Sequence, residues 1–589
     1  MVETWTPFKT SIEQVQQQTG TTSIAGVKRS LGQSRSDAYG GSVIEHRAAH
    51  DSAQVSAKRQ NFGAGGKGRL AASEICKINS NTTDGFDISN PRQTADFIPG
   101  PSQNPLLSLT HPKYGLPETL VKNFASLGIN SIYPWQSSCL LGRGILEGSK
   151  NLVYTAPTGG GKSLVADVLM LKTIIDNPTK KAILVLPYVA LVQEKLKWLR
   201  KVCEGVCKKA GPLSQCDHDL PRWRKPHHSS VRVVGFFGGS KARATWMDVD
   251  IAICTIEKAN SLVNTAIEEC TINELGIVVL DELHMVDDDH RGYLIEVVAS
   301  KLLTLDCRVQ LVGMSATLTN TAVLAQWLRA KYYNTTYVPV PIEEHLVYDN
   351  SIYPISSSSA FFKTTSQLNS SQALSGISPT HHIEASKHIE FKNPITNAVL
   401  ALAIQTASTG YGALVFCSGR QGCQSTALLI SEAMPERVGD DLQKLERRKD
   451  VISDLRSLAV GLDETLGKTV LRGVAFHHAG LTAEEREIVA EAYDKGIICV
   501  IVATCSLAAG INLPARRVIL QGARMGRDLI GPAMLRQMRG RAGRKGKDEV
   551  GESYLCCQKV DLEEVAQLLE ADLPTVESSL TPEKRGIKR

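Results

Sequence analysis

Residues 151–163, NLVYTAPTGGGKS, constrain the fold of this chain more than any other stretch. An apolar run typical of a buried strand stops at three consecutive glycines, and the helical pattern LVADVLMLKTII follows Lys162 and Ser163. In such a strand, loop and helix, consecutive backbone N–H groups and the positive end of the helix dipole point at one spot and bind phosphate. Glycine is needed there because a Cβ would block close approach of the backbone. The stretch therefore predicts an α/β fold with a phosphate cradle.

The cradle has the residues needed for a nucleotide bound together with magnesium. Lys162 would reach the β- and γ-phosphates, and the Ser163 hydroxyl would bind Mg²⁺. The first glycine of the usual P-loop formula is replaced by Ala156, so this stretch alone leaves a chance glycine turn as the alternative. The residues predicted to hold the nucleotide are Ala156, Pro157, Thr158, Gly159, Gly160, Gly161, Lys162 and Ser163.

A second stretch, residues 277–284 (IVVLDELH), supplies the carboxylates that such a site needs. Its apolar, mostly β-branched residues predict a buried parallel strand that ends at Asp281 and Glu282. We expect Asp281 to hold Mg²⁺, directly or through water, and Glu282 to orient and deprotonate the attacking water. Phosphoryl transfer requires mainly positioning and charge neutralisation, so these are the roles that hydrolysis needs. The alternative is a surface acidic turn after a strand; with the cradle upstream, the two stretches indicate an ATPase core.

Residues 537–544, QMRGRAGR, place two arginines three positions apart between glycines. Arg541 and Arg544 suit a bidentate grip on a phosphate during its transfer. A solvated basic face is the alternative, because the stretch as far as Lys547 is cationic. The phosphate cradle in the other half of the chain favours the phosphate-contacting interpretation.

These stretches belong to an ordered set that resembles a superfamily 2 helicase core of the Ski-like group. The resemblance is to the branch that includes the helicase-like region of DNA polymerase theta and its polymerase-free helicase relative. It covers about residues 110–575 and extends into connecting segments such as HRGYLIE (290–296) and GLDETLGKTV (461–470). The motifs are, in chain order, APTGGGKS (156–163), LPYVALVQEK (186–195), GGSKAR (238–243), CTIEKAN (254–260), DELH (281–284), MSATL (314–318), LVFCSGRQ (414–421), FHHAGLT (476–482), VATCSLAAGINLPARR (502–517) and QMRGRAGRKG (537–546).

The resemblance implies an α/β fold of two tandem RecA-like parallel-sheet domains that use ATP and Mg²⁺. Gln136 matches the family's adenine-reading glutamine, although an ordinary polar helix residue is the alternative. Gly510 and Asn512 match positions where the second domain closes on the nucleotide. The arginine-finger motif of the family corresponds to Gln537, Arg541 and Arg544.

Other positions match the family's coupling and nucleic-acid motifs. Ser315 and Thr317 match the motif that couples hydrolysis to domain movement. Residues 522–534 stand where relatives place a strand-separating hairpin, and their glycines and proline are compatible with one. The family often has a tyrosine just before the arginine-finger motif, where this chain has Leu535-Arg536, so the sequence supports strand separation less than hydrolysis. The positions that match backbone contacts to nucleic acid are Gly239, Ser240 and Thr255 in the first domain and Thr504 in the second.

Composition and periodicity divide the chain into parts. The N-terminal region is rich in Ser, Gln, Gly and Ala with few aromatic residues, which predicts disorder. Two sets of alternating strand and helix patterns follow, each typical of a parallel sheet with helices on both faces. The predicted divisions are a disordered tail at 1–105, a first RecA-like domain at 106–345, a linker with a serine-rich insertion at 346–395, a second RecA-like domain at 396–575 and a tail at 576–589.

Charge and cysteine usage narrow the class of protein. The net charge of only +6 favours binding of nucleic acid in a local groove over a generally basic surface. The 14 cysteines are dispersed, which indicates a reducing compartment. Cys203, Cys207, Cys216 and His218 are soft ligands, but their spacing fits no standard zinc finger, so we interpret them as loop and core residues. No signal peptide or apolar run of membrane-spanning length is present, and the resemblance implies a nuclear location.

Together these features predict an ATP-dependent 3′-to-5′ single-stranded DNA translocase or helicase of DNA repair. The expected partners are single-stranded, forked or overhang DNA, and repair proteins through the N-terminal tail, with no membrane. An RNA helicase is a second hypothesis, since Ski-like relatives act on RNA with the same motifs. An ATP-gated clamp or annealing module is a third hypothesis: the sequence stops at LTPEKRGIKR (580–589), an apparent truncation before the winged-helix and ratchet domains of relatives, and the hairpin at 522–534 is not readable from the sequence.

Overall fold

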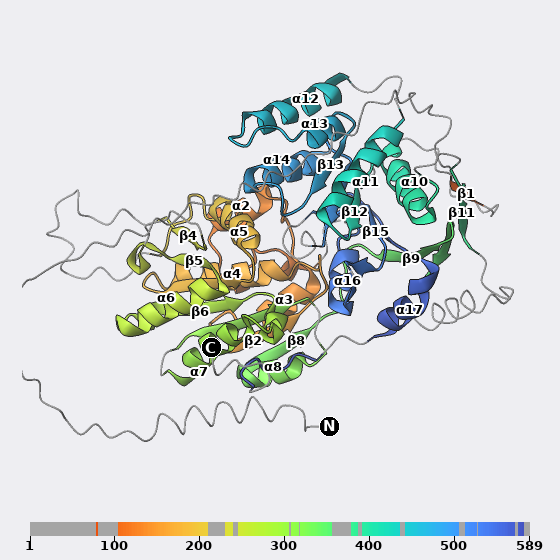
Figure 1. Cartoon of the computed structure of the whole chain (residues 1–589). Helices are drawn as coiled ribbons and strands as arrows, with labels where there is room; N and C mark the ends of the chain where they lie inside the picture. Colours follow the sequence, from red (N-terminus) through yellow and green to blue (C-terminus); the bar gives the residue numbers. More distant parts are fainter. Residues whose placement is uncertain are drawn as a thin grey trace, which may run out of the picture.

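The computed structural model describes residues 78–80, 104–209, 230–238, 245–305, 308–316, 319–355, 379–386, 391–435, 442–505, 513–526, 528–571 and 575–581. Within these residues the chain forms two α/β domains that lie side by side (Figure 1). Among the described residues, none of the helices combines the length and apolarity needed to span a lipid bilayer.

Domain 1 is built on a seven-stranded sheet in which every pair of neighbours is parallel. The strand order is β4-β5-β3-β6-β7-β2-β8. The strands are β2 (Asn151–Thr155), β3 (Lys181–Leu186), β4 (Val233–Phe236), β5 (Ile251–Thr255), β6 (Leu275–Leu280), β7 (Gln310–Ser315) and β8 (Ala330–Asn334). The expected parallel sheet is therefore confirmed for this domain.

Helices cover both faces of the domain 1 sheet, because alternate residues of each strand point to opposite sides. Leu152 and Tyr154 pack with one group of helices, whereas Val153 between them packs with the other. The first group is α2 (Glu118–Ser126), α3 (Pro134–Leu140), α4 (Lys162–Asp176) and α5 (Val189–Val202), and the second is α6 (Ile256–Glu268), α7 (Gly292–Thr304) and α8 (Thr321–Trp327). Short 3₁₀ helices join these elements: η2 (Pro105–Leu107), η3 (Pro112–Tyr114), η5 (Trp246–Asp248), η6 (Ile272–Glu274) and η7 (Leu283–Asp287).

Domain 2 has a nine-stranded sheet in the order β1-β11-β10-β9-β18-β15-β12-β14-β13. Its strands are β1 (Ile78–Ser80), β9 (Ile342–Tyr348), β10 (Ser351–Pro354), β11 (His381–Ile383), β12 (Ala413–Cys417), β13 (Val474–His477), β14 (Val500–Thr504), β15 (Arg517–Gln521) and β18 (Gly551–Cys556). Pairs from β9 to β13 are parallel, and the edge pairs made by β10, β11 and β1 are antiparallel. The expected parallel sheet is therefore confirmed for the strands of the predicted second domain, and the antiparallel edge strands, which lie outside its predicted bounds, make the whole sheet mixed.

The helices of domain 2 enclose one large core. They are α10 (Pro394–Ser408), α11 (Arg420–Ala433), α12 (Leu442–Ser457), α13 (Glu464–Leu471), α14 (Ala483–Asp494), α16 (Pro532–Arg539), α17 (Leu562–Glu570) and the 3₁₀ helix η9 (Lys559–Asp561). A two-stranded ribbon of β16 (Arg524–Met525) and β17 (Asp528–Leu529) stands apart from the main sheet.

Three of the predicted divisions differ from the structure. The linker placed at 346–395 contains β10, β11 and the end of β9, whose buried Leu346 and Val347 belong to the domain 2 core. The charged residues of IEEHLVY interrupt the apolar pattern that would predict a strand. The strand forms because β9 pairs on both sides, with β18 in parallel and with β10 antiparallel. In the tail predicted to be disordered, β1 pairs with β11. Of the final tail, residues 576–581 pack on domain 1.

The two domains meet beside the phosphate cradle. A Cβ on Gly540, just after α16, would lie only 2.8 Å from Thr158 Cβ of the cradle. Figure 1 shows α16 of domain 2 next to α3 of domain 1. Lys545 stacks over the ring of Tyr133 at 4.4 Å, and Lys197 pairs with Glu487 across the same boundary. The structure therefore places the two sets of predicted motifs face to face.

Candidate active site

The phosphate cradle has the predicted strand, loop and helix geometry. The chain leaves β2, turns through the glycines and enters α4 at Lys162. Gly159 and Gly161 have φ angles of +77° and +84°, in the left-handed region that favours glycine. A Cβ on Gly160 would lie 2.9 Å from Pro157 O. These positions therefore need glycine for conformation or for space, as the sequence predicts.

Two side chains of α3 brace the cradle from behind. Trp135 Nε1 donates to Gly160 O at 3.2 Å, and Gln136 Nε2 donates to Gly161 O at 2.7 Å. Gln136 Oε1 accepts from the backbone N–H of Tyr133 at 2.7 Å, and its residue is only 2% exposed. Gln136 is therefore not an ordinary solvated helix residue, and both ends of its amide fix the loop. The sequence signal for these contacts is the short segment YPWQ, in which two aromatic residues precede Gln136.

Lys162 carries a cation into the centre of the cradle. Its Nζ donates to Ala156 O at 3.1 Å and to Pro157 O at 3.3 Å. Burial lowers the pKa of this ammonium group, the nearby Glu282 and Asp281 carboxylates raise it, and Arg541 lowers it. The amine thus lies among acidic groups of domain 1 and an arginine of domain 2. Exposed Ser163 follows it in the first turn of α4.

Asp281 and Glu282 leave the end of β6 in the way the sequence predicts. Asp281 Oδ1 accepts the backbone N–H of Glu282 at 2.8 Å. Burial raises the pKa of Asp281, Glu282 raises it further, and Lys162 opposes both. Glu282 has a φ of +50°, a left-handed conformation that is costly for a residue with a side chain. Strain of this kind persists only where surrounding contacts hold it, and it is common at active sites.

Close contacts through His284 connect Glu282 with the next motif. His284 Nδ1 lies 3.3 Å from Ser315 Oγ and 3.3 Å from Glu282 Oε2. Ser315 ends β7, is buried, and its carbonyl accepts the N–H of Ala156 at 3.3 Å. The predicted coupling residue Ser315 therefore touches both the cradle and the histidine. The sequence analysis predicted no role for His284. Its position in DELH, two residues after Glu282, is the feature that could have indicated this contact.

The two arginines of the finger motif face different groups. Half-buried Arg541 lies near Glu194 and Glu282 of domain 1, whose charges raise its pKa against the lowering by burial. Arg544 instead donates through Nε to Asp548 Oδ2 at 3.0 Å, within domain 2. The structure therefore brings Arg541, and not Arg544, to the cradle. Gln537 lies on α16, half-buried, one turn before them.

The predicted nucleic-acid contacts are only partly within the described residues. Thr255 precedes α6 as its N-cap residue, and Thr504 ends β14. Both follow parallel strands, at the edge of the sheet where ligands bind in such folds. Gly239, Ser240, Thr317, Gly510 and Asn512 lie outside the described residues.

The region 522–534 does contain a hairpin. Arg524 pairs with Leu529 and Met525 with Asp528, and Gly526 with a φ of +70° begins the turn. Arg524 Nε donates to Asp561 Oδ1 at 2.8 Å, which ties the base of the hairpin to the chain just before α17. The ribbon is short, and its glycine turn is the feature that the sequence offered.

The donor set suits magnesium better than a soft metal. The Ser163 hydroxyl and the Asp281 carboxylate are hard oxygen donors, and Mg²⁺ is usually held by one or two carboxylates together with substrate phosphates. Across the described ranges, no group of three or more His, Cys, Asp or Glu residues is gathered as a metal site. Of the cysteines weighed for zinc, Cys203 packs in the domain 1 core, Cys207 is exposed and Cys216 lies outside the described residues.

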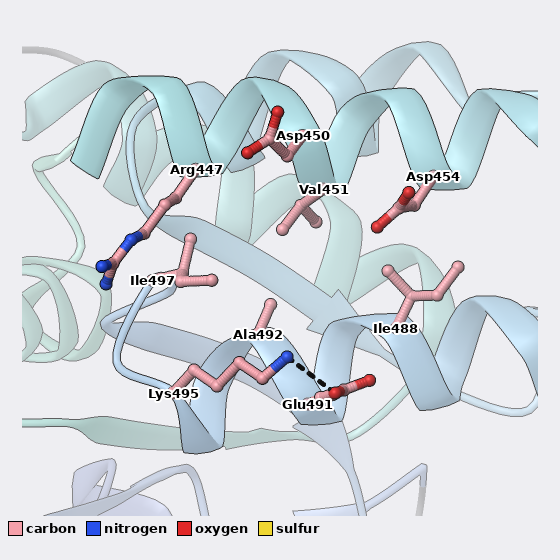
Figure 2. Close-up of a pocket in the computed structure, with 9 residues that line it drawn as sticks. All are labelled: Arg447, Asp450, Val451, Asp454, Ile488, Glu491, Ala492, Lys495 and Ile497. Atoms are coloured by element: carbon pink, nitrogen blue, oxygen red, sulfur yellow. Dashed lines mark ion pairs between the residues drawn. The ribbon is translucent and has the colours of Figure 1, made fainter. Parts of the chain in front are cut away.

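A groove on domain 2 is separate from these motifs. It lies between α12 and α14, with a volume of about 470 Å³ (Figure 2). Its walls carry charges of both signs, and Glu491 and Lys495 neutralise each other at 2.7 Å. Such a surface lacks the uniform positive charge expected of a phosphate or nucleic-acid site, so we give it no role in nucleotide chemistry.

Comparison with known proteins agrees with the geometry of the two domains. Residues 136–324 match the DEAD/DEAH box helicase family, and residues 456–546 match the helicase conserved C-terminal domain. Residues 551–589 match a helix-turn-helix domain. That last match begins at β18 and includes α17, a region that the predicted division splits between the second domain and a tail.

Relatives with similar sequences are helicases or carry helicase regions. DNA polymerase theta of Mus musculus is 35% identical over 498 residues, which span 79% of this chain and 18% of that protein. Helicase POLQ-like of Homo sapiens is 35% identical over 484 residues, 81% of this chain and 40% of the relative. ATP-dependent DNA helicase Hel308 of Methanocella arvoryzae is 30% identical over 463 residues, 77% of this chain and 54% of the relative.

The chain thus spans between about a fifth and a half of the length of these relatives. The two helicase matches cover β2 to β7 of domain 1 and β13 to β15 of domain 2, and they include the cradle, Asp281, Glu282 and Arg541. Two segments of the chain thus match the DEAD/DEAH box helicase family and the helicase conserved C-terminal domain, and its relatives are consistent with the Ski-like group that its motifs resemble.

Proposed function

We propose that this chain is an ATP-dependent DNA motor that hydrolyses ATP between its two domains. The observation that carries the proposal is the position of Arg541. Arg541 belongs to domain 2 but is close enough to domain 1 that Glu282 raises its pKa and that its own charge lowers the pKa of Lys162 in the cradle. A site completed by both domains couples the state of the nucleotide to the closure of the domains.

Each residue has a role that its chemistry supports. Lys162 and the N–H groups of the cradle bind the β- and γ-phosphates of ATP, and Gln136 supports the loop beside the adenine position. Ser163 and Asp281 would hold Mg²⁺, which neutralises phosphate charge when it is bound. Glu282 orients and deprotonates the attacking water, and Arg541 stabilises the charge that develops on the transferred phosphoryl group.

The DNA-directed part of the proposal rests on the relatives and on the strand ends. The names of two relatives specify DNA, as a polymerase and as an ATP-dependent DNA helicase. Thr255 and Thr504 end strands of the two domains, where a bound strand would contact both. We propose 3′-to-5′ movement on single-stranded, forked or overhang DNA in nuclear repair. Repair proteins would bind through the N-terminal tail.

Two alternative functions are compatible with the same site. An RNA helicase would use the same motifs on another strand. An ATP-gated clamp or annealing module would hydrolyse ATP without separating strands; the shortness of the β16–β17 hairpin favours it over efficient unwinding.

The first experiment is steady-state ATP hydrolysis by the purified chain with no nucleic acid, single-stranded DNA, duplex DNA or single-stranded RNA. We expect single-stranded DNA to give the strongest stimulation. Equal or greater stimulation by RNA would favour the RNA helicase. A strand-displacement assay on forked DNA then separates the motor from the clamp, because the clamp would hydrolyse ATP and leave the duplex intact.

A further inference from the structure

The chain returns to domain 1 after completing domain 2. Residues 575–581, which we call the returning segment, follow α17 in the chain but pack on η7, α7 and the start of α8. Val576 is only 3% exposed and belongs to a hydrophobic cluster of domain 1. Its backbone N–H and C=O both bond the side chain of Asn320, at 3.1 and 2.9 Å. The segment is therefore bound through specific contacts.

The contacts of the returning segment concentrate on Ser579. Its Oγ donates to Val286 O at 2.7 Å and lies 3.3 Å from Asp288 O. Its N–H donates to Oε2 of the fully buried Glu296 at 2.9 Å, and the N–H of Leu580 donates to the same oxygen at 3.1 Å. Hydrogen bonds from N–H groups to a carboxylate are charge-assisted and strong in a buried setting.

The absence of a side chain at Gly292 leaves space for Ser579. A Cβ on Gly292, at the start of α7, would lie 2.6 Å from Ser579 Oγ and 2.1 Å from Val286 O. Glycine at 292 thus lets the returning segment approach η7 closely. The sequence HRGYLIE contains both Gly292 and Glu296, which share one side of the contact.

The braced element, η7, begins directly after Glu282. The carbonyl of Glu282 accepts the N–H of Met285 at 2.8 Å, and Met285 O accepts the N–H of Asp288 at 3.1 Å. The left-handed φ of +50° at Glu282 is strained, so the turn that follows must be held by its surroundings. Ser579 binds the carbonyl groups at the far end of that turn.

We infer that the returning segment positions the proposed water-activating residue: Ser579, fixed by Glu296, holds η7 and thereby the carboxylate of Glu282. Ser579 and Glu296 are positioning residues, since neither touches the nucleotide site. The inference rests on the proposed function, because it assigns Glu282 a position that matters for hydrolysis. The segment that matches the helix-turn-helix domain is thus divided in space: β18 and α17 belong to domain 2, and the returning segment packs on domain 1.

The test compares Ser579→Ala with Ser578→Ala in the full chain. Ser578 is a matched control: it is 3% exposed, lies in the same segment, and its Oγ accepts the N–H of Leu580 at 3.1 Å within the segment itself. We expect Ser579→Ala to lower kcat for ATP about tenfold with KM unchanged, less than the roughly hundredfold that an ångström of misplacement can cost. Ser578→Ala should keep the kcat of the native chain.

Hydrogen exchange provides a second readout that does not depend on catalysis. Ser579→Ala should speed exchange at the amides of Met285 and Asp288, whereas Ser578→Ala should not. Equal exchange in the two variants, or equal kcat, would overturn the inference. If the native chain itself failed to hydrolyse ATP, the proposed function would fail, and the exchange experiment would still report whether Ser579 braces η7. Glu296→Gln keeps the side-chain shape and should reproduce the effect of Ser579→Ala in weaker form.

Discussion

Domain 1 and domain 2 share an architecture but contribute unequally to the site. Domain 1 has a wholly parallel sheet, and its cradle, its acidic pair and the His284–Ser315 contact all lie within one domain. Domain 2 has a mixed sheet whose edge is built from antiparallel strands, and it directs one arginine, Arg541, toward that site. The groups predicted to bind the nucleotide thus lie in domain 1, and domain 2 adds one arginine near them.

This difference teaches where each kind of mutation should act. A change in the cradle removes binding and chemistry together, because the phosphate groups have no other ligand set. A change in the domain 2 arginine removes only an interaction that strengthens during phosphoryl transfer. Changes elsewhere in domain 2 should alter its stability and leave the chemistry of domain 1 intact.

The largest effect is expected for Lys162→Ala. Removing the cation of the cradle should abolish ATP turnover while the fold, checked by circular dichroism, stays intact. Lys172→Ala is the control on the same helix, because Lys172 only pairs with Asp176 at 2.8 Å. Steady-state hydrolysis separates the two. Normal turnover in Lys162→Ala would refute the proposed site, and with it the conclusion that domain 1 supplies the phosphate-binding groups.

The sharpest test of the comparison is Arg541→Ala beside Arg544→Ala. We expect Arg541→Ala to lower kcat about a thousandfold, the range typical of arginine fingers, with little change in ATP affinity. Arg544→Ala leaves Asp548 buried without its cation, which typically costs about 3–5 kcal/mol of stability. Thermal unfolding and single-turnover hydrolysis measure the two effects. Equal catalytic loss in both variants at unchanged stability would contradict the division of roles.

Glu282→Gln should separate binding from chemistry within domain 1. The amide keeps the shape of the side chain but cannot accept the proton of water, so kcat should fall about a hundredfold or more. ATP should remain bound because Lys162 and the cradle are unchanged. Nucleotide retention on a filter measures this, with exposed Glu269→Gln as control. Loss of ATP binding would instead give Glu282 a structural role.

The smallest effect concerns the acid sensitivity of domain 2. Burial lowers the pKa of His345 from 6.5 to about 4, so the folded state keeps this imidazole neutral. Because the unfolded chain then binds the proton more readily, the stability is complete above about pH 6.5 and falls as the pH decreases toward 4. The loss between pH 7 and pH 5 should be about 2 kcal/mol.

His345→Phe should remove that part of the pH dependence and keep the stacking of the ring on Tyr554, whose centroid lies 4.6 Å away. Calorimetry at pH 7 and pH 5 gives the thermal midpoint of each protein. The variant should lose less stability than the native chain over this interval. An identical loss in both proteins would show that His345 does not titrate on unfolding.

Local sequence determined the cradle, the acidic strand end and the sheet of domain 1. The glycines, Lys162 and the run IVVLDE act over a few residues, where backbone conformation and burial follow directly from residue type. The same rules missed β9 and β11, since Glu343 and Glu344 interrupt the apolar alternation of β9, β11 is only three residues long, and both strands are held by neighbours distant in sequence. Their existence depends on pairing that no local pattern encodes.

The sequence by itself determined which chemical groups this protein carries and on which elements they stand. Only the tertiary structure decided which of them come together: Arg541 near Glu282 and Lys162, His284 with Ser315, and Ser579 with η7. The physical reason is that identity and periodicity are local properties of a chain. Contacts between residues distant in the sequence arise from packing within and between the two domains, and that packing selects one partner among several of equal chemistry.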